Sequence, residues 1–348
     1  MTTKKKLVVG ISGMNAVDNP GPGVGVARSL KEDPALDVRV VGLCYDAMEP
    51  GIYMDWLVDR SFMVPYPSNN PEALFDRLAY IKHAYGLDFL LPTLDVELPV
   101  YIKYQEQLEK MGIHVFLPSM DQFKLRGKDL LPELAKNIGI HCPRTASVNS
   151  LDALVEALDT IQLPVMIKGV YYKAYYAYTT QEAIGHYHHV VAEWGYPVIV
   201  QEIIQGDELN LVGVGDGEGN SLGCVQIKKM WITALGKIWT GVSIKNQAMQ
   251  DAAENFLKHY KWKSAFELEC IVRDNELYLI EINPRFPAWS YFATGLGVNL
   301  PSNLIHSAMN WPVPQNMAYD AGKLFIRYTY ELITDMLPFQ KITTTGEV

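Results

Sequence analysis

Short apolar runs alternate with amphipathic stretches through the first third of the chain. The apolar runs lie at 7–12, 38–46, 88–93 and 114–119, and helix-like stretches lie at 24–33, 75–86 and 100–112. Short apolar runs joined by amphipathic segments are typical of strand–helix–strand units that build a parallel sheet. We therefore expect an α/β domain at the start of the chain.

The pattern changes from about Ser119 onwards. Alternating apolar and polar positions now occur in pairs of runs, at 209–229 and at 264–284, and each pair is interrupted by a short polar turn. Alternation on both sides of a tight turn predicts antiparallel hairpins. The second part is therefore predicted to be α+β, and the chain is divided into 1–118 and 119–348.

The composition limits the classes of partner. The chain has 348 residues with 30 Lys and Arg against 39 Asp and Glu, a formal net charge of −9. Nucleic acid is disfavoured because a polyanion needs a basic surface. The longest apolar stretches, such as 7–9 and 89–91, are far shorter than the roughly 20 residues of a membrane span. We expect a cytoplasmic protein, and its four widely spaced cysteines suit a reducing cytosol.

A loop rich in glycine and proline, 15–28, follows the first predicted strand. Glycine at a helix start lets the backbone approach a pyrophosphate, so one interpretation is an NAD site. Gly23 lies too far beyond the strand for that motif, and Arg28 stands where its third small residue belongs. A substrate loop, or a turn without chemistry, fits better. We expect pocket residues from this loop and from the stretch with Trp289 and Tyr291.

Two carboxylates mark the last predicted hairpin. Glu269 lies on its first strand, and Glu281 and Asn283 lie on its second, in segments that otherwise look buried. The side chains of residues two apart leave the same face of a strand. With the three-residue turn Asp274–Glu276, Glu269 opposes Glu281, whereas a two-residue turn would put Glu269 on the other face.

Oxygen donors that converge in this way suit Mg²⁺. Burying an unpaired charge is costly, and two neighbouring carboxylates repel each other unless a cation lies between them. The alternative is that each glutamate faces solvent. The residue types alone leave both interpretations open.

Four segments in this order resemble the ATP-grasp superfamily, and in particular its branch with biotin carboxylase and the large chain of carbamoyl-phosphate synthase. They are GKDLLPELAKNIGIHCPRT at 127–145, LPVMIKG at 163–169, VIVQEIIQGDELN at 198–210, and FELECIV with ELYLIEINPR within 266–285. The resemblance covers about 119–297, and more loosely 1–118. It implies an ATP-grasp fold preceded by a Rossmann-like pre-ATP-grasp domain, with a small lid subdomain at about 148–204.

The resemblance assigns roles to individual residues. Lys128 and Lys168 would hold nucleotide phosphates, Gln201, Glu202 and Ile204 would contact adenine, Glu208 would bind ribose, and Glu269, Glu281 and Asn283 would hold Mg²⁺ or, alternatively, Mn²⁺. Arg285 and Lys168 are the expected catalytic residues, since a guanidinium can stabilise a transferring phosphoryl group or bind a carboxylate. Taken singly, each lysine is equally an ordinary surface residue, Ile204 a core residue and Arg285 a structural ion-pair partner.

One segment departs from the family pattern. Family lids carry a glycine-rich loop after the second lysine, whereas 169–183 contains one glycine and five tyrosines between Tyr171 and Tyr178. The loop would close with tyrosine hydroxyls and Lys173, or its rings would face the acceptor or pack within the lid. The cluster His186–His189 is expected on a surface helix face rather than at a metal.

The resemblance implies an ATP-dependent carboxylate–amine ligase. A carboxylate would attack the γ-phosphate to form an acylphosphate, and the amine of an amino acid or peptide-like acceptor would displace phosphate. A bicarbonate-activating enzyme is one alternative, and a nucleotide-binding protein without catalysis, favoured by the tyrosine-rich loop, is another. Small-molecule substrates are the implied partners, and a homodimer is compatible with the family. The tail from Trp311 has strand-like pieces that either finish a sheet or form a partner surface.

Overall fold

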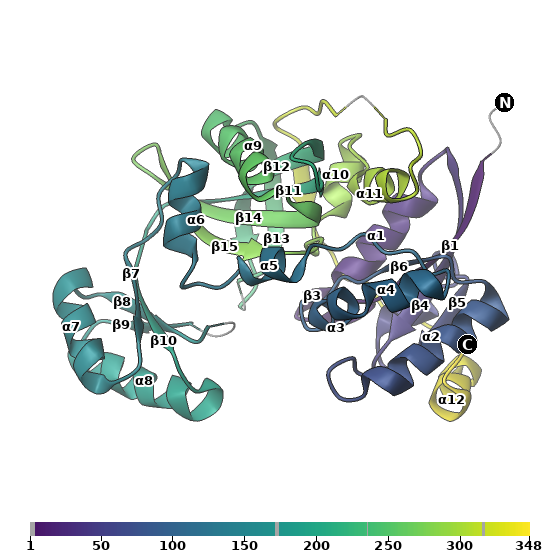
Figure 1. Cartoon of the computed structure of the whole chain (residues 1–348), viewed down its shortest axis with the longest axis horizontal. Helices are drawn as coiled ribbons and strands as arrows, with labels where there is room; N and C mark the ends of the chain where they lie inside the picture. The colour runs from purple at the N-terminus through teal and green to yellow at the C-terminus, as the bar shows by residue number, and fades with distance from the viewer. Residues whose placement is uncertain (1–3, 171–173, 235, 315–316) are drawn as a thin grey trace.

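The computed structural model describes residues 4–170, 174–234, 236–314 and 317–348. Three sheets organise these residues, with the largest one between the other two in Figure 1. A further two-stranded pair, β2 (Ala16–Val17) and β3 (Asn19–Pro20), lies in the glycine- and proline-rich loop. The predicted combination of α/β and α+β parts is confirmed.

The first sheet is parallel throughout, in the order β5–β4–β1–β6. Its strands are β1 (Lys5–Ile11), β4 (Leu36–Cys44), β5 (Arg60–Met63) and β6 (Phe89–Leu91). Helix α1 (Pro22–Lys31) connects β1 to its parallel neighbour β4, and α2 (Pro71–Tyr85) connects β5 to β6, the two edge strands of the sheet. Buried apolar side chains line both faces of the sheet, which confirms the Rossmann-like prediction.

Local signals set the ends of several helices in this half. The Asn70 side chain accepts a hydrogen bond from the Ala73 N–H and so caps α2. In the second part of the chain, Gly139 adopts a φ of 82° just after α6 (Leu131–Ile138), the stop that its position after an amphipathic run predicts. The other short helices are a 3₁₀ turn (Pro50–Tyr53), α3 (Leu98–Lys103), α4 (Gln105–Lys110), α5 (Met120–Lys124) and α6 (Leu131–Ile138).

A small antiparallel sheet has the order β7–β10–β8–β9. Its elements are β7 (Thr145–Val148), α7 (Leu151–Ile161), β8 (Val165–Lys168), β9 (Ala174–Ala177), α8 (Thr180–Trp194) and β10 (Val198–Glu202). Both helices pack on one face, against alternate strand residues such as Ile167 and Val200. Lys168 and Gln201 therefore lie on the opposite face.

The large sheet is antiparallel, in the order β15–β14–β11–β12–β13–β16. Its strands are β11 (Asp207–Asp216), β12 (Ser221–Ile232), β13 (Ile238–Ile244), β14 (Lys263–Arg273), β15 (Glu276–Asn283) and β16 (Leu324–Ile326). Helices α6 and α9 (Gln247–Tyr260) cover one face, over Leu209, Leu211 and Leu268. On the other face, Val212 and Ala265 join the core shared with the first sheet, α10 (Tyr291–Gly295) and α11 (Leu300–Ala308).

The β14–β15 hairpin has the predicted pairing of Glu269 with Glu281, but its turn is shorter than predicted. Glu269 does oppose Glu281, but the turn has only two residues, Asp274 and Asn275, both with positive φ. The prediction of a three-residue turn is therefore wrong. The register shifts between Glu269 and Cys270, where Ile280 is the extra residue of a β-bulge. This bulge restores the face that the short turn would otherwise reverse.

The tail completes two sheets. β16 pairs with β13, so the strand-like piece after Trp311 finishes the large sheet. Helix α12 (Met336–Thr345) then packs beside β5, and Ser61 and Val348 exchange backbone hydrogen bonds of 2.7 and 2.9 Å. The last residues thus extend the first sheet, although they follow the large sheet in sequence.

The predicted domain limits, including a lid at 148–204, stay a prediction. Among the described helices, none combines the length and apolar character needed to cross a membrane.

A buried ion pair joins the two halves of the molecule. Asp33 follows α1, and its Oδ2 lies 3.4 Å from Nε2 of His306 on α11. Nδ1 of the same ring lies 2.7 Å from the Pro312 carbonyl, and the Ser302 hydroxyl donates to Asp33. The hydrogen bond to Asp33 outweighs burial and raises the pKa of His306.

We predict that this pair makes stability depend on pH. Because the folded state raises the His306 pKa, its contribution is fully present below about 6.5 and is lost as pH rises through the raised value. His306→Gln should lower the unfolding free energy by roughly 1–2 kcal/mol at pH 6 and by less at pH 9. Urea unfolding across this range measures the difference, and an equal loss at both pH values would contradict the prediction.

Candidate functional site

Strand register brings polar side chains to one face of the large sheet. Asn210 of β11 opposes Glu269 of β14, and Val212 opposes Glu267. Because alternate residues share a face, Glu208, Asn210, Glu267 and Glu269 all point away from α6 and α9. This polar stretch begins where the apolar contact of the same face with the first sheet ends.

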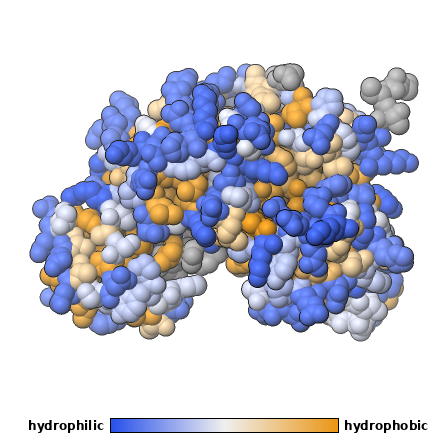
Figure 2. Space-filling view, in the orientation of Figure 1, coloured by the Kyte–Doolittle hydropathy of each residue, from blue (hydrophilic) through white to orange (hydrophobic). Residues whose placement is uncertain are grey.

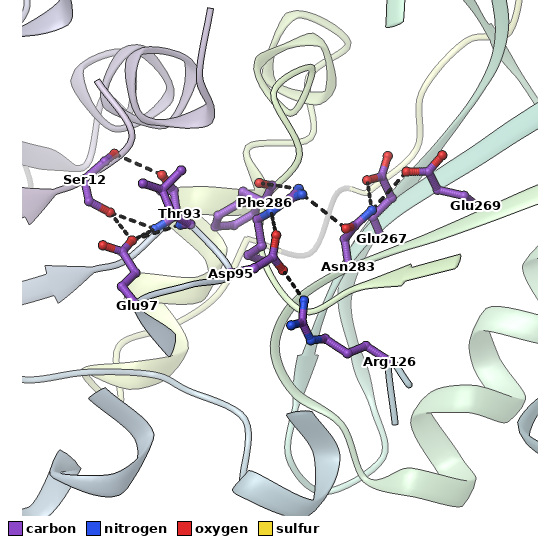
Figure 3. Close-up of polar contacts among 11 residues, drawn as sticks. Ser12, Thr93, Asp95, Glu97, Arg126, Glu267, Glu269, Asn283 and Phe286 are labelled. Atoms are coloured by element: carbon purple, nitrogen blue, oxygen red, sulfur yellow. Dashed lines mark hydrogen bonds and ion pairs between the residues drawn. The ribbon is translucent and has the colours of Figure 1, made fainter. Parts of the chain in front are cut away.

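Strand β15 adds Glu281 and Asn283 to this face. Asn283 Nδ2 donates to Glu267 Oε2 and to Glu269 Oε1, each at 2.9 Å, as Figure 3 shows. Asn283 Oδ1 accepts from Arg285 Nη2 at 3.1 Å. Burial, together with the charge of Glu269, raises the pKa of the Glu281 carboxyl. A carboxylate in such surroundings gains from binding a cation.

Glu267 is a site carboxylate that the sequence reasoning missed. Its side chain is 3% exposed and accepts from Asn210 Nδ2 at 2.7 Å and from Trp289 Nε1 at 2.6 Å, besides Asn283. Burial and the neighbouring Glu269 raise its pKa to about 7. The signal was available, because Glu267 lies two residues before Glu269 on a predicted strand and therefore shares its face.

Lys229 of β12 is a second missed residue. Its Nζ lies 3.0 Å from Glu208 Oε2 and 2.8 Å from Glu269 Oε2, and its side chain is 8% exposed. The sequence places two lysines side by side, and only the pairing of β12 with β11 decides which one reaches the site. Lys228 lies on the opposite face, where it pairs with Asp207 at 2.6 Å.

Two more lysines approach these carboxylates from other elements. Lys168, at the end of β8, donates to Gln201 Oε1 at 2.7 Å, and Gln201 Nε2 donates to Thr145 Oγ1 at 3.0 Å. Lys128 lies buried in the turn before α6. Burial and the charge of Lys128 lower the pKa of Lys168 to about 8, while Glu281 acts in the opposite direction. The structure thus brings Lys128, Lys168 and Glu281 within electrostatic reach of one another.

The predicted adenine contacts are less open than expected. The Glu202 carboxylate pairs with Arg144 at 3.1 Å, and the Glu202 N–H donates to the Arg144 carbonyl at 2.8 Å. That N–H is therefore engaged, which leaves the Glu202 carbonyl for a base. Ile204 is 7% exposed and packs as a buried residue. Both assignments stay predictions.

Arg285 is held by the first sheet. Its Nε donates to Asp95 Oδ2 at 3.1 Å, and Asp95 Oδ1 lies 3.4 Å from Arg126 Nη1 (Figure 3). Asp95 lies in the loop after β6, so this loop sets the position of the guanidinium. Arg285 thus lies at the candidate site and also forms a structural ion pair with Asp95, so the two interpretations of this residue are compatible.

A buried carboxylate fixes that loop. Glu97 is fully buried and accepts from the Thr93 N–H at 2.8 Å and from the Leu94 N–H at 2.9 Å. The hydroxyls of Ser12 and Tyr45 also donate to it. The loop is therefore anchored by four donors to one side chain, which explains how it holds Asp95 against Arg285.

Glu208, Glu269, Glu281, Asn283 and Arg285 line a cleft of about 620 Å³. The described lining of this cleft does not include the other predicted site residues, Lys128, Lys168, Gln201, Glu202 and Ile204. Its lining comes from the polar face of the large sheet, from the first sheet's loops with Asn15, Asn19 and Asp95, and from Arg126 after α5 and Trp289 after β15. The molecule is hollowed between the lobes of the small sheet and the first sheet in Figure 2. The expected contribution of the loop at 15–28 is confirmed. Trp289 also lines the cleft, as expected, whereas Tyr291 is not in the described lining. The Tyr291 ring stacks on the Arg28 guanidinium, with 3.7 Å between the guanidinium carbon and the ring centroid.

The tyrosine-rich loop is only partly described, since Tyr171 and Lys173 lie outside the described residues. Tyr175 stacks on His186 with ring centroids 4.9 Å apart, and His188 and His189 are exposed on α8. The surface-helix interpretation of the histidines is therefore confirmed.

Within the described ranges, no three His, Cys, Asp or Glu side chains form a ready metal cluster. The predicted ligand set has two carboxylates and one amide, so it needs further oxygen donors.

Comparison with known proteins fits this geometry. Residues 136–288 match the family model of the ATP-grasp domain. This segment is an ATP-grasp domain. The carbamoyl phosphate synthase large chain of Thermotoga neapolitana is 20% identical over 208 residues, which are 53% of this chain and 18% of that protein. The chain thus spans less than a fifth of that curated relative.

Solved structures share the ATP-grasp fold over most of the chain. A biotin carboxylase β,γ-ATP complex from Campylobacter jejuni has a TM-score of 0.72 at 15% identity, covering 91% of this chain and 74% of that one. A biotin carboxylase domain dimer from Hydrogenobacter thermophilus, with MgADP and bicarbonate, has a TM-score of 0.66 at 17% identity, covering 87% and 69%. The predicted ATP-grasp fold after a Rossmann-like domain is confirmed.

The oxygen donors of the site fit Mg²⁺. Mg²⁺ commonly binds one or two carboxylates and takes its remaining ligands from water and substrate phosphates. Glu281 has no hydrogen-bond partner among the described residues, and burial makes its charge costly. The arrangement thus leaves one carboxylate ready for a cation, opposite two lysines that suit phosphate oxygens.

We predict that nucleotide affinity falls above pH 8. Lys168 binds phosphate only when protonated, and the pKa of about 8 means that it loses its proton there. The Kd for ADP with Mg²⁺ should rise roughly fivefold between pH 8 and 9. Lys168→Met should bind more weakly and with a flatter pH profile, as calorimetry would show. Parallel profiles for both proteins would exclude Lys168 as the titrating group.

Proposed function

We propose that the protein is an ATP-dependent carboxylate–amine ligase. It activates a carboxylate as an acylphosphate, joins the acyl group to an amine and releases ADP and phosphate. The observation that carries the proposal is the cluster of Glu269, Glu281 and Asn283 in an ATP-grasp domain, facing the buried Lys128 and the half-buried Lys168. Since the similar proteins are distant in sequence, the activity rests on this geometry.

Each predicted residue has a role in nucleotide binding. Lys128 and Lys168 hold phosphate oxygens from two sides, and Glu208 accepts from the ribose hydroxyls. Gln201 contacts adenine through its amide, the backbone of Glu202 and Ile204 pairs with the base edge, and Ile204 packs on the base. Glu269, Glu281 and Asn283 would hold Mg²⁺, or Mn²⁺ in its place. When bound, the ion would neutralise phosphate charge during the transfer.

The chemistry needs positioning more than a side-chain nucleophile. A carboxylate oxygen of the acid bonds to the γ-phosphorus while the bond to the β-phosphate oxygen breaks, and ADP leaves. The amine then attacks the acyl carbon, phosphate leaves with the bonding electrons, and the amine loses a proton. Arg285, fixed by Asp95, holds the acid's carboxylate or stabilises the transferring phosphoryl group. Lys168 stabilises the same charge from the lid side.

A second candidate is activation of bicarbonate. The matched curated relative is a carbamoyl phosphate synthase, and the Hydrogenobacter structure contains bicarbonate beside MgADP. In this reaction bicarbonate takes the position of the acid and forms carboxyphosphate. Both candidates use the same cleft. Small-molecule substrates, a cytoplasmic location and a homodimer remain part of the proposal.

An assay of ADP release separates these functions. The protein with ATP and Mg²⁺ should release ADP only with a matching pair from a panel of small carboxylic acids, amino acids and other amines. ADP release with bicarbonate and no amine would favour the second candidate. Tight nucleotide binding without ADP release on the whole panel would favour a non-catalytic nucleotide-binding protein.

We predict that Glu281→Gln lowers kcat/KM at least about a hundredfold, because the metal loses its most accessible carboxylate. The melting temperature should change little, since Glu281 accepts no hydrogen bond from the described residues and desolvation of its charge offsets the attraction of Lys128 and Lys168. Glu276→Gln is the matched control, an exposed glutamate on the same strand that pairs with His141. Unchanged turnover in Glu281→Gln would remove the metal assignment.

A further inference from the structure

The segment 324–330, which contains β16, carries a row of exposed apolar side chains. Every second residue of this segment is apolar and exposed, namely Leu324, Ile326, Tyr328 and Tyr330. The rings of Tyr328 and Tyr330 stack with their centroids 5.8 Å apart, as side chains on the same side of an extended chain can. Phe325 points the other way and packs against the core shared with the first sheet. One side of the segment is therefore packed within the chain, and the described residues leave the other side open.

The open side continues across the neighbouring strands. Ile326 pairs with Thr240 of β13, and Thr240 pairs with Trp231 of β12, so all three share one face of the large sheet. This is the face that α6 and α9 cover at β11 and β14, on the opposite side from the candidate site. We call the exposed residues at its uncovered end the tail surface, which consists of Trp231, Leu324, Ile326, Tyr328 and Tyr330.

β16 is also the edge strand of the large sheet. It ends the order β15–β14–β11–β12–β13–β16 and pairs with β13 alone. The Arg327 N–H donates to the Trp239 carbonyl at 3.0 Å, toward β13. Because backbone groups alternate in direction along an antiparallel strand, the N–H and C=O groups of Leu324 and Ile326 point to the open edge. An unpaired edge beside exposed apolar side chains is a template for another strand.

A second copy of this chain fits that edge. Antiparallel pairing about a two-fold axis places the same segment on both sides, so the apolar row meets an identical row. No like charges meet there, because Arg327, the one charged residue of 324–330, turns inward and donates to the Ala288 carbonyl.

The area of the tail surface also suits a stable dimer. Its three aromatic and two aliphatic side chains are each more than half exposed and present on the order of 600 Å² per copy. A standard interface buries about 800 Å² per partner, and the paired backbone of the two edges adds to the side-chain area.

We propose that the chain forms a homodimer in which the β16 edges of two copies pair antiparallel and the two tail surfaces pack together. The large sheets of both copies then form one continuous sheet. The cleft of each copy stays accessible, because the tail surface lies on the other face of the sheet. This inference does not rest on the proposed function, so its failure would leave the nucleotide site untouched.

Sedimentation over a wide range of protein concentrations tests the inference. The native chain should be a dimer. Ile326→Asp places two carboxylates against each other in the interface and should raise the dimer Kd at least about a hundredfold. Val155→Asp is the matched control, an exposed β-branched residue on α7, and should stay dimeric. A monomeric native chain, or a dimer that Ile326→Asp leaves intact, would overturn the inference.

Hydrogen exchange gives a second measurement, which needs no variant. The outward-facing amides of Leu324 and Ile326 should be protected in the dimer and should exchange freely after dilution to the monomer. Equal exchange at both concentrations would contradict the proposed edge pairing. If Ile326→Asp does not fold, Trp231→Ala on the same face should raise the dimer Kd about tenfold or more, and an unchanged Kd would count against the tail surface.

Discussion

The pairing of β14 with β15 is the constraint on which the site depends. Glu269 and Glu281 meet because a two-residue turn is compensated by a bulge at Ile280. Without that extra residue, one of the two carboxylates would point into the apolar core under α9, at a prohibitive cost in desolvation. The bulge therefore fixes the site and the fold of the hairpin together, which is typical of bulges beside functional sites.

The charges of the site are balanced before any ligand binds. Its carboxylates are Glu208, Glu267, Glu269, Glu281 and Asp95, and its cations are Lys128, Lys168, Lys229, Arg126 and Arg285. Lys237, a further cation of the lining, pairs with Asp18. Buried charges are tolerated when they are paired, and most of these are. A nucleotide brings further negative charge, so it needs an accompanying divalent cation. Balance of this kind explains why the cleft is polar and yet stable without ligand.

The first sheet completes the site instead of merely preceding it. In its order β5–β4–β1–β6, the chain reverses direction across the sheet between β1 and β6. Loops after these two strands meet there, with Ser12 and Thr93 bound to Glu97. Ligands of open parallel sheets commonly bind at such a point. The loop after β6 also contains Asp95, which accepts a hydrogen bond from Arg285. Both parts of the chain therefore line one cleft.

The sequence by itself determined the parallel start, the antiparallel hairpins and the ATP-grasp segments, because periodicity and motif spacing are local properties. It missed Glu267, although alternation implied its place, and it reached the right hairpin pairing through the wrong turn. Only the tertiary structure decided that Lys229 and not Lys228 enters the site, and that Asp95 holds Arg285. Those facts depend on strand register and on contacts between segments far apart in the chain, which residue spacing does not encode.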